Sequence, residues 1–290
     1  MTNIFRALAT SIFCVSFAGC ASAQTAIERS FIPTADLDFP AFAASDDQSS
    51  LQIDNTTWND FLTRYLITGD DGVARVRYAA VTEGDRQALS EYVAMLEATD
   101  PAALSSDEQL AFWINLYNAV TVAVILDHHP LSSIRKIKSG PFDFDGPWDD
   151  KRVTVAGEAL SLNDIEHGII RAVFNEPRIH YAVNCASIGC PNLRREAYAG
   201  STLDAALDQQ ARDYINHPRG VSVDEKGRVT ASKIYTWFRE DFGQSERDAL
   251  DHIRNFAEPA LNEALDGADD IRRYDYDWSL NDAPPSPSDG

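Results

Sequence analysis

The segment Ser105–Pro130, SSDEQLAFWINLYNAVTVAVILDHHP, decides the fold, because it is the most apolar stretch after the first two dozen residues. Ser105 followed by Glu108 is the pattern of a capping box, which marks a helix start. Pro130 marks the end, since proline cannot continue a helix. The stripe at spacings of three and four consists of Leu110, Trp113, Ile114, Tyr117, Thr121, Val124 and Ile125. The other side is also largely apolar, so we expect a helix buried on all sides at the centre of the core.

Two asparagines interrupt this helix pattern. Asn115 and Asn118 lie about one turn apart and share a second face of the predicted helix. A buried amide that lacks hydrogen-bond partners costs about 1–3 kcal/mol, so both side chains must find partners. Two hypotheses follow. The amides tie a neighbouring loop to the helix, which is their commoner role, or Asn118 donates a hydrogen bond inside a functional site.

The segments around the central helix predict a mixed fold. Helical spacing occurs at 56–67, 85–98, 162–174, 203–215, 232–243 and 246–265. Extended patterns occur at 74–81, in two hairpin-like pairs at 152–162 and 220–231, and in the two-sided apolar run 178–185. We therefore predict a single α+β domain. Its helical N-terminal half packs on a small, mostly antiparallel sheet that contains Val153–Val155 and Ile179–Val183.

Residues 1–23 have the features of an export signal, with a positive charge at Arg6 and then the apolar run ALATSIFCVSFAG. ASA at Ala21–Ala23 fits the pattern of ordinary signal cleavage, whereas FAGC ending at Cys20 resembles a bacterial lipobox. Both alternatives lead to the cell envelope. We expect a periplasmic or outer-membrane-anchored protein that meets the membrane only through a lipid on Cys20.

Composition divides the rest of the chain into three parts. Residues 24–50 form a polar leader, and residues 51–278 are expected to form one globular domain. The tail at 279–290, with NDAPPSPSDG at its end, has almost nothing to bury and is expected to be disordered.

The charge of the chain excludes one class of partner. The 290 residues include 45 acidic and 25 basic side chains, with a formal net charge of −20. The resulting field repels phosphate backbones, so we expect no nucleic-acid partner.

The stretch Ile179–Arg194, IHYAVNCASIGCPNLR, holds both cysteines that remain after the signal, Cys185 and Cys190. In an oxidising compartment an isolated pair favours a disulfide. The four-residue gap between them, with histidines before rather than after, is unlike a zinc site, so we expect no metal. We also expect no cofactor. A free Cys185 at the end of a strand is the alternative, with the loop that follows offering N–H groups to an oxyanion and Gly189 permitting close approach.

Glu166 lies on the edge of the apolar stripe in the predicted helix 162–174, so it must be half-buried or paired. Burial would raise its pKa and a nearby cation would lower it. The candidate partners close in sequence are His167, Arg171, Arg178 and His180. A purely structural tie between Glu166 and an arginine is one hypothesis, because such ties also shift pKa values.

The expected geometry separates the histidines from Cys185. With about 1.5 Å per residue along a helix and about 3.3 Å along a strand, Glu166, His167 and His180 come to similar heights. Cys185 lies higher, near the helix start at Ser161. Alternation along a regular strand also points His180 and Cys185 to opposite faces, so a pair of the two requires the strand to bend.

Four motifs together resemble one family. AFWINLYNAVT, LSLNDIEHGIIR, PRIHYAVNCASIGCPNLR and KIYTWFREDF, with Ala197-Tyr198 between the last two, are similar to the bacterial and plant group called domain of unknown function 547. The similarity spans about Tyr78 to Phe242. The resemblance implies little chemistry, because the family is named for lacking a settled activity. In the family the position of Cys185 is cysteine whereas that of Cys190 can be serine, which implies that the motif does not exist to provide a disulfide.

Two functions from different classes follow. The first is a thiol-dependent hydrolase or acyl transferase that acts on an unidentified small molecule or peptide, with Cys185 as the nucleophile. His180 or His167 would be its base, Glu166 would orient that base, and Asn118 would donate an amide hydrogen bond. The alternative is a non-enzymatic envelope protein, a binding or structural lipoprotein, in which Cys185 and Cys190 form a disulfide.

Overall fold

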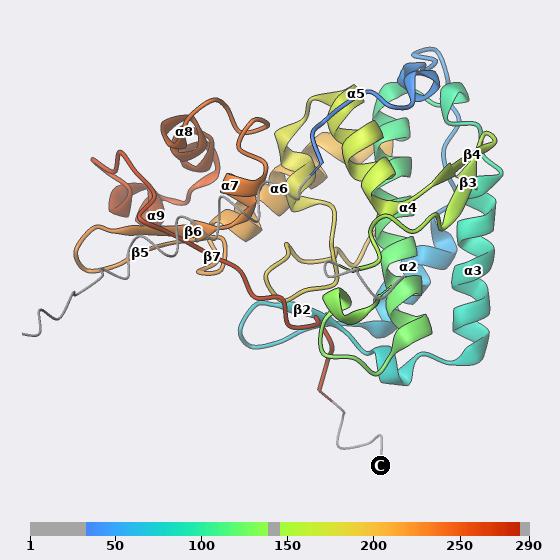
Figure 1. Cartoon of the computed structure of the whole chain (residues 1–290), viewed down its shortest axis with the longest axis horizontal. Helices are drawn as coiled ribbons and strands as arrows, with labels where there is room; N and C mark the ends of the chain where they lie inside the picture. The colour runs from blue at the N-terminus through green and yellow to red at the C-terminus, as the bar shows by residue number, and fades with distance from the viewer. Residues whose placement is uncertain (1–32, 139–145, 285–290) are drawn as a thin grey trace, which may run out of the picture.

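The computed structural model describes residues 33–138 and 146–284 (Figure 1). Export signal and lipobox therefore lie outside the described residues. The α-helices are α2 (Thr56–Tyr65), α3 (Glu83–Glu97), α4 (Ser106–His128), α5 (Ala172–Phe174), α6 (Leu203–Ile215), α7 (Ile234–Trp237), α8 (Glu246–Phe256) and α9 (Pro259–Ala264). The 3-10 turns are η1 (Pro40–Ala43), η2 (Tyr78–Ala80), η3 (Pro101–Ala103), η4 (Ile134–Lys136), η6 (Pro177–Tyr181) and η7 (Gly200–Thr202). The π-helical segment η5 (Asp164–Arg171) runs directly into α5.

The strands form three small sheets. Two are antiparallel hairpins, β1 (Leu66–Thr68) with β2 (Ala74–Val76) and β3 (Val153–Val155) with β4 (Glu158–Leu160). In the third sheet β5 (Val221–Val223) pairs antiparallel with β6 (Val229–Ser232), and β6 pairs parallel with β7 (Arg273–Asp275). The α+β class, the helical N-terminal half and both predicted hairpins are confirmed.

Helix α4 is the central helix that the sequence predicts. Trp113, Ile114 and Ile125 are fully buried, and α2 and α3 pack nearby in the same core. The helix is long and apolar enough to cross a membrane by composition, but nearly all of its apolar stretch is buried inside the protein. Ser105 caps it by accepting a hydrogen bond from Glu108 N. The Glu108 carboxylate turns away from the cap and accepts from Ile53 N at 2.8 Å and Gly200 N at 2.6 Å, so only half of the capping box forms.

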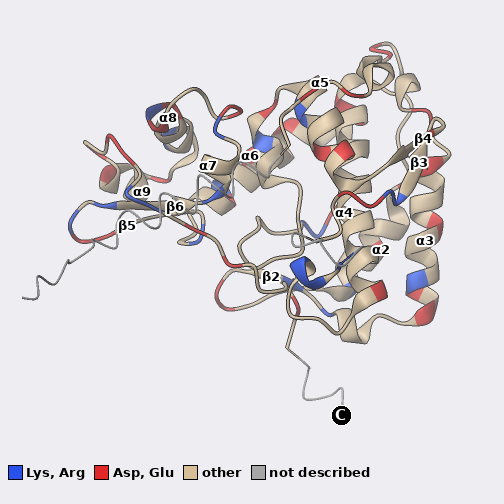
Figure 2. Ribbon diagram, viewed as in Figure 1, with Lys and Arg blue, Asp and Glu red and all other residues tan. Residues whose placement is uncertain are grey.

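A second core lies at the other end of the molecule. It gathers side chains from α6, α7, α8 and the three-stranded sheet. Figure 1 shows α8 and β6 at the opposite end of the molecule from α3. Tyr214, Tyr235 and Leu250 are among its fully buried members. Trp278 packs against both cores. Acidic side chains occur on helices and loops of both parts, in keeping with the net charge of the chain (Figure 2).

The predicted strand at Ile179–Val183 is wrong, and with it the sheet that should contain it. The chain forms the 3-10 turn η6 there, with Pro177 in its first turn and the Glu176 side chain accepting from Arg178 N at 2.9 Å. A short apolar run does not distinguish a buried strand from a buried helical turn, and the proline and the cap favour the turn.

Two further boundaries differ from the prediction. The single helix expected at 246–265 is broken into α8 and α9, because Pro259 begins a new helix. The disordered tail expected from residue 279 is wrong for 279–284. Leu280 and Asn281 are buried, and Asn281 N donates to Ala186 O at 3.0 Å. Residues 285–290 lie outside the described part.

Candidate functional site

Cys185 and Cys190 are joined by a disulfide in the loop that follows η6. Cys185 is half-buried, whereas Cys190 is 4% exposed. The loop turns sharply after Cys185, since Ala186 adopts a left-handed conformation with φ of 58°. Asn184 supports this turn by accepting from Ala186 N at 2.8 Å. Cys185 is therefore the more exposed residue of the pair.

Asn118 holds the chain that enters this loop. Its Nδ2 donates to Ala182 O at 2.9 Å, and its Oδ1 accepts from Asn184 N at 2.8 Å. Asn115 binds the backbone of Tyr198 in the same way. Its Nδ2 donates to Tyr198 O, and its Oδ1 accepts from Tyr198 N. Both amides thus tie a loop to α4. Asn118 positions the cysteine loop through the backbone of Ala182 and Asn184 rather than through its sulfurs.

The C-terminal strap, residues 276–283, runs along the cysteine loop. Ile188 N donates to Ser279 O and Gly189 N donates to Asp277 O, both at 2.8 Å. A Cβ on Gly189 would lie 2.8 Å from Asp277 N, so this close approach requires glycine. The expectation that Gly189 permits a close approach holds, but the approaching group is the strap. Because the strap carbonyls occupy these two N–H groups, they are not available to an oxyanion.

Tyr276 brings the strap to the sulfurs. Its hydroxyl lies 3.1 Å from Cys185 Sγ and 3.0 Å from Cys190 Sγ. Ser187 Oγ donates to it at 3.0 Å. Burial and the neighbouring phenol of Tyr214 raise the pKa of Tyr276 far above its usual range, so the hydroxyl keeps its proton and can donate it toward sulfur. Cys190 Sγ also accepts from Cys185 N at 3.0 Å.

The Tyr276 ring is held by aromatic neighbours. Its centroid lies 4.7 Å from that of Trp237 and 4.8 Å from that of Trp278. Trp278 in turn contacts Trp148 edge to face at 5.8 Å. Rings packed at these distances stabilise one another, so the Tyr276 hydroxyl has a fixed position beside the disulfide.

A second group of polar side chains, the histidine cluster, comprises His167, Arg171, His180, Phe238 and Asp241. Arg171 donates to both carboxylate oxygens of Asp241, at 2.5 and 3.0 Å, and to His167 Nδ1 at 3.1 Å. His180 Nε2 lies 2.6 Å from Asp241 Oδ2. The Phe238 ring stacks on His180 at 4.1 Å. The structure thus brings His167 and His180 together around one ion pair.

Burial influences which side chains of this cluster are charged. It lowers the pKa of His167 to about 3, with the charge of Arg171 acting in the same direction, so His167 is neutral near pH 7. Burial also lowers the pKa of His180, although Asp241 opposes this. Burial alone would raise the pKa of Asp241, but hydrogen bonds from His180 and Arg171 outweigh it and hold that pKa below its usual range.

Glu166 is buried beside the cluster and has a different partner from those expected. Burial raises the pKa of Glu166 to about 7, opposed by a hydrogen bond from Tyr117 on α4 and by the charge of Arg171. The charges of Glu166 and Tyr276 also interact, since Glu166 contributes to the raised pKa of that tyrosine. Glu166 therefore lies within electrostatic range of both the histidine cluster and the cysteine loop, and a phenol replaces the expected arginine as its hydrogen-bond partner.

No histidine of the described chain forms a hydrogen bond with Cys185. His180 and His167 are held by Asp241 and Arg171, and His252 lies 3.1 Å from the Tyr181 hydroxyl. His180 Nδ1 is buried and has no hydrogen-bond partner among the described residues. The thiol and the imidazoles proposed from sequence as one site occupy two places.

Sequence reasoning missed Asp241 and Tyr276. Asp241 lies 61 residues after His180, and Tyr276 lies 91 residues after Cys185. Asp241 stands in the KIYTWFREDF motif, where a carboxylate beside an inward-facing aromatic stripe is a usable signal. Nothing local in the sequence marks Tyr276.

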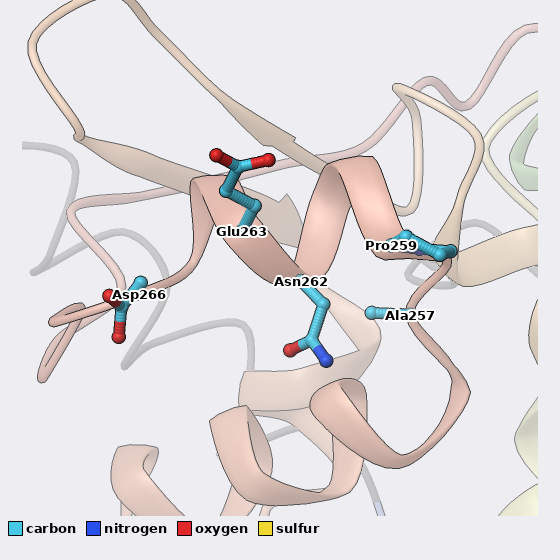
Figure 3. Close-up of a pocket in the computed structure, with 5 residues that line it drawn as sticks. All are labelled: Ala257, Pro259, Asn262, Glu263 and Asp266. Atoms are coloured by element: carbon cyan, nitrogen blue, oxygen red, sulfur yellow. The ribbon is translucent and has the colours of Figure 1, made fainter.

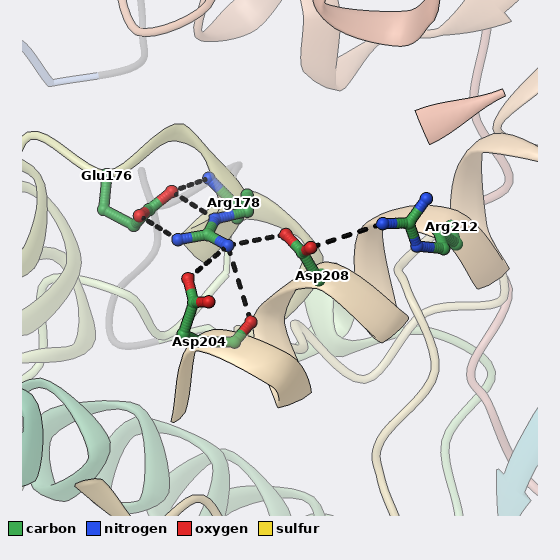
Figure 4. A network of polar contacts seen from close by, with 5 residues as sticks. All are labelled: Glu176, Arg178, Asp204, Asp208 and Arg212. Atoms are coloured by element: carbon green, nitrogen blue, oxygen red, sulfur yellow. Dashed lines mark hydrogen bonds and ion pairs between the residues drawn. The ribbon is translucent and has the colours of Figure 1, made fainter. Parts of the chain in front are cut away.

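An arginine network fixes the turn that precedes the cysteine loop (Figure 4). Arg178 on η6 contacts Glu176, and it reaches Asp204 at 2.8 Å and Asp208 at 2.6 Å on α6. Arg212 pairs with Asp208 from the next turn of the same helix. All of these carboxylates meet arginine, so the network serves to dock η6 on α6.

Two hollows of the described structure lie away from the cysteines. The larger, of about 500 Å³, is lined by Ala257, Pro259, Asn262, Glu263 and Asp266 around α9 (Figure 3). The smaller, of about 10 Å³, is lined by Arg171, Asn175, Glu176, Pro177, Ile179 and Asp241, and has room for at most one water. Within residues 33–138 and 146–284, no group of three or more His, Cys, Asp or Glu side chains is arranged to hold a metal ion.

Comparison with known proteins gives one match. Residues 101–215 match the family model described as "Protein of unknown function, DUF547". No curated protein and no solved structure matches the chain. The matched segment contains α4, η5, the cysteine loop and α6, so the family finding covers the loop and most of the histidine cluster but neither Asp241 nor Tyr276.

Proposed function

We propose that this chain, whose residues 101–215 match the DUF547 family, is an exported envelope protein with a thiol–disulfide exchange site at Cys185. One observation carries the proposal. The half-buried Cys185 is bonded to a buried Cys190, and the sulfur of Cys190 alone accepts a backbone N–H, that of Cys185. This asymmetry gives the two sulfurs separate roles.

The exchange step follows from that asymmetry. A thiolate of a partner attacks Cys185 Sγ and forms a mixed disulfide, while the Cys185–Cys190 bond breaks and its electron pair leaves on Cys190. The Cys185 N–H and the Tyr276 hydroxyl stabilise the departing thiolate. In the reverse step, the Cys190 thiolate attacks the mixed disulfide and releases the partner. Cys190 is shielded from direct attack because it is buried.

The hydrolase or acyl transferase hypothesis has less support from the geometry. It requires a base within hydrogen-bond reach of a free Cys185 thiol. The groups within that reach are the Ser187 and Tyr276 hydroxyls, at 3.3 and 3.1 Å. Burial raises the pKa of the Tyr276 phenol far above its usual range, so the phenol stays protonated and cannot accept the thiol proton. Thiol exchange needs no base in the protein, because the partner supplies the thiolate.

The compartment is part of the proposal. A signal-like N-terminus and an isolated cysteine pair both favour an oxidising envelope compartment, where disulfides form and persist. Cell fractionation tests this, with Cys20→Ser as the variant that removes a lipid site. We expect the protein in the membrane fraction and its variant in the soluble periplasm if Cys20 carries lipid. Recovery of the unprocessed chain from the cytoplasm would contradict export.

The exchange site is tested with two matched variants, Cys190→Ser and Cys185→Ser. Each leaves one free thiol, and each is incubated with oxidised glutathione and analysed by mass spectrometry. We expect Cys190→Ser to form a mixed disulfide at Cys185 quickly, and Cys185→Ser to react at least tenfold more slowly because its thiol is buried.

Other outcomes identify the alternatives. Equal reactivity of the two variants would contradict the assigned roles. A wild-type disulfide that survives excess reduced glutathione would show that the bond only closes the loop. Hydrolysis of model amides or esters by Cys190→Ser, but not by Cys185→Ser, would instead support the thiol-dependent hydrolase.

A further inference from the structure

Arg219 is a partly buried arginine beside the cysteine loop that pairs with no carboxylate of the described chain. Its Nη1 donates to Ile188 O at 3.0 Å, and its Nη2 donates to Asn192 Oδ1 at 2.6 Å. Its guanidinium carbon lies 5.6 Å from the centre of the Tyr214 ring. Its Nε is buried and has no hydrogen-bond partner among the described residues. Every contact of this cation is with a neutral group.

Two other arginines of the region show the usual arrangement. The buried Arg171 meets Asp241 and Glu240, and the partly buried Arg178 meets three carboxylates (Figure 4). A cation that is partly removed from water without a counter-charge is costly, and burial lowers the pKa of Arg219. An anion that forms nearby during function would offset this cost.

Arg219 is hydrogen-bonded to the loop on which the exchange reaction creates an anion. It holds the carbonyl of Ile188, two residues before Cys190, and Tyr214 holds the next carbonyl, Gly189 O, at 2.7 Å. The charge of Arg219 also lowers the pKa of Tyr276, whose hydroxyl lies 3.0 Å from Cys190 Sγ. The cation and the sulfur therefore share one loop and one phenol neighbour.

Other charges do not cancel this effect. Asp71 acts on Arg219 from a distance, but its carboxylate is paired with Arg75. Glu166 also acts on Tyr276, and because burial raises its pKa to about 7, Glu166 carries less negative charge near pH 7 than an ordinary carboxylate. Among these groups, Arg219 is the one cation directed at the loop without a carboxylate partner.

We infer that Arg219 is a positioning residue that stabilises the Cys190 thiolate formed when the disulfide opens, and that it thereby makes the pair a better oxidant. The inference rests on the proposed exchange function. In the disulfide form the loop carries no anion, and opening the bond supplies the counter-charge that Arg219 lacks. Stabilising the reduced form shifts the equilibrium toward oxidation of the partner.

The test is the redox equilibrium of the full chain with defined ratios of reduced to oxidised dithiothreitol or glutathione. We expect Arg219→Gln to lower the equilibrium constant for reduction of the protein about tenfold, which corresponds to about 30 mV. Arg219→Lys keeps the charge and should stay within about threefold of wild type. Alkylation against pH should show a higher thiol pKa in Arg219→Gln, a change that a purely structural role would not cause.

Two further variants keep the test decisive. Arg212→Ala removes an arginine that is paired with Asp208 outside the cysteine site, so we expect an unchanged equilibrium. Asn192→Asp places a carboxylate beside Arg219 and so neutralises its charge. It should lower the equilibrium constant for reduction of the protein, and it provides a test if Arg219→Gln does not fold. An unchanged equilibrium in both Arg219→Gln and Asn192→Asp, or an equal shift in Arg219→Lys, would overturn the inference.

The two proposals can fail separately. Equilibration with dithiothreitol measures the potential even when glutathione does not react, so the role of Arg219 is tested without a physiological partner. Failure of Cys190→Ser to form a mixed disulfide would reject the exchange function alone.

Discussion

The histidine cluster and the cysteine site come from the same part of the chain, but they differ in how their charges are satisfied. In the cluster, Arg171 meets Asp241 and Glu240, and burial keeps His167 neutral. At the cysteine site, Arg219 has no carboxylate partner in the described chain, and two donors point at one sulfur. The first arrangement is complete as it stands. The second is complete only when the disulfide opens, so we assign chemistry to the cysteines and structure to the histidines.

Glu166 stands between the two regions. Arg171 and Asp241 both act on its pKa, and it contributes to the raised pKa of Tyr276. Its direct hydrogen bond is to Tyr117 on the central helix. The following variants test the difference between the two regions, beginning with the largest expected effect.

The largest effect is expected from opening the histidine cluster. Arg171→Gln removes the cation from Asp241 and leaves a partly buried carboxylate with only His180 as a partner. Breaking a buried pair in this way costs about 3–5 kcal/mol of unfolding free energy. Urea denaturation measures it. Arg212→Ala, at a half-exposed arginine paired with Asp208, is the control and should cost at most about 1 kcal/mol. Similar losses in both variants would contradict a structural role for the cluster.

A pH-dependent effect is expected from Glu166. Its pKa is raised from an ordinary 4.5 to about 7, so the folded protein holds this proton after the unfolded chain has released it. Stability from this group is complete below pH 4.5 and is lost as pH rises to about 7. The stability of Glu166→Gln relative to wild type should therefore increase by about 3 kcal/mol between pH 4 and pH 7.5.

The same measurement has an internal check. His167, with a pKa lowered to about 3, acts in the opposite direction, because stability falls as pH drops below about 6.5. Comparing each variant with wild type at the same pH removes this contribution. A stability difference for Glu166→Gln that does not change with pH would show that the carboxyl titrates normally.

A smaller loss of unfolding free energy is expected from removing the disulfide. Cys190 follows Cys185 by only five positions, so the bond restricts a short loop of the unfolded chain. Loop-closure entropy gives about 2 kcal/mol for such a loop. Urea denaturation of the double variant Cys185→Ser with Cys190→Ser measures it. A loss as large as that of Arg171→Gln would mean that the bond is a principal support of the fold.

The smallest effect is expected from Tyr276→Phe, which removes one hydroxyl beside both sulfurs. A hydrogen bond to a thiolate is worth about 1.5 kcal/mol. With both cysteines kept, Tyr276→Phe should therefore form a mixed disulfide about tenfold more slowly than wild type. Stopped-flow fluorescence or quenched mass spectrometry follows the rate. Trp237→Phe keeps that hydroxyl and should change the rate little. Equal rates for Tyr276→Phe and wild type would remove Tyr276 from the site.

Local patterns predicted part of the candidate site. The cysteine pair was identified as a disulfide candidate from its isolation, and Asn115 and Asn118 were identified as amides that need partners. Both side chains do find backbone partners in the loops that they were expected to hold. The grouping of His167 with His180 also follows the prediction, although the predicted strand that carries His180 is a 3-10 turn. The short apolar run at 179–183 could not distinguish these two conformations.

Other features could not be predicted from any local pattern. Asp241, Tyr276 and Arg219 reach the site only after elements distant in sequence have packed together. The strap could not be foreseen either, because its composition is typical of a disordered tail and its order comes from backbone hydrogen bonds to the cysteine loop.

The sequence by itself determined the central helix α4, helix α6 at Leu203–Ile215, the two hairpins and the presence of a reactive or bonded cysteine pair. These depend on side-chain periodicity and caps, which act within a few residues along the chain. Only the tertiary structure decided which partner each polar side chain receives. Buried polar groups must be satisfied, and the groups that satisfy them come from whatever the packing of both cores brings within about 3 Å.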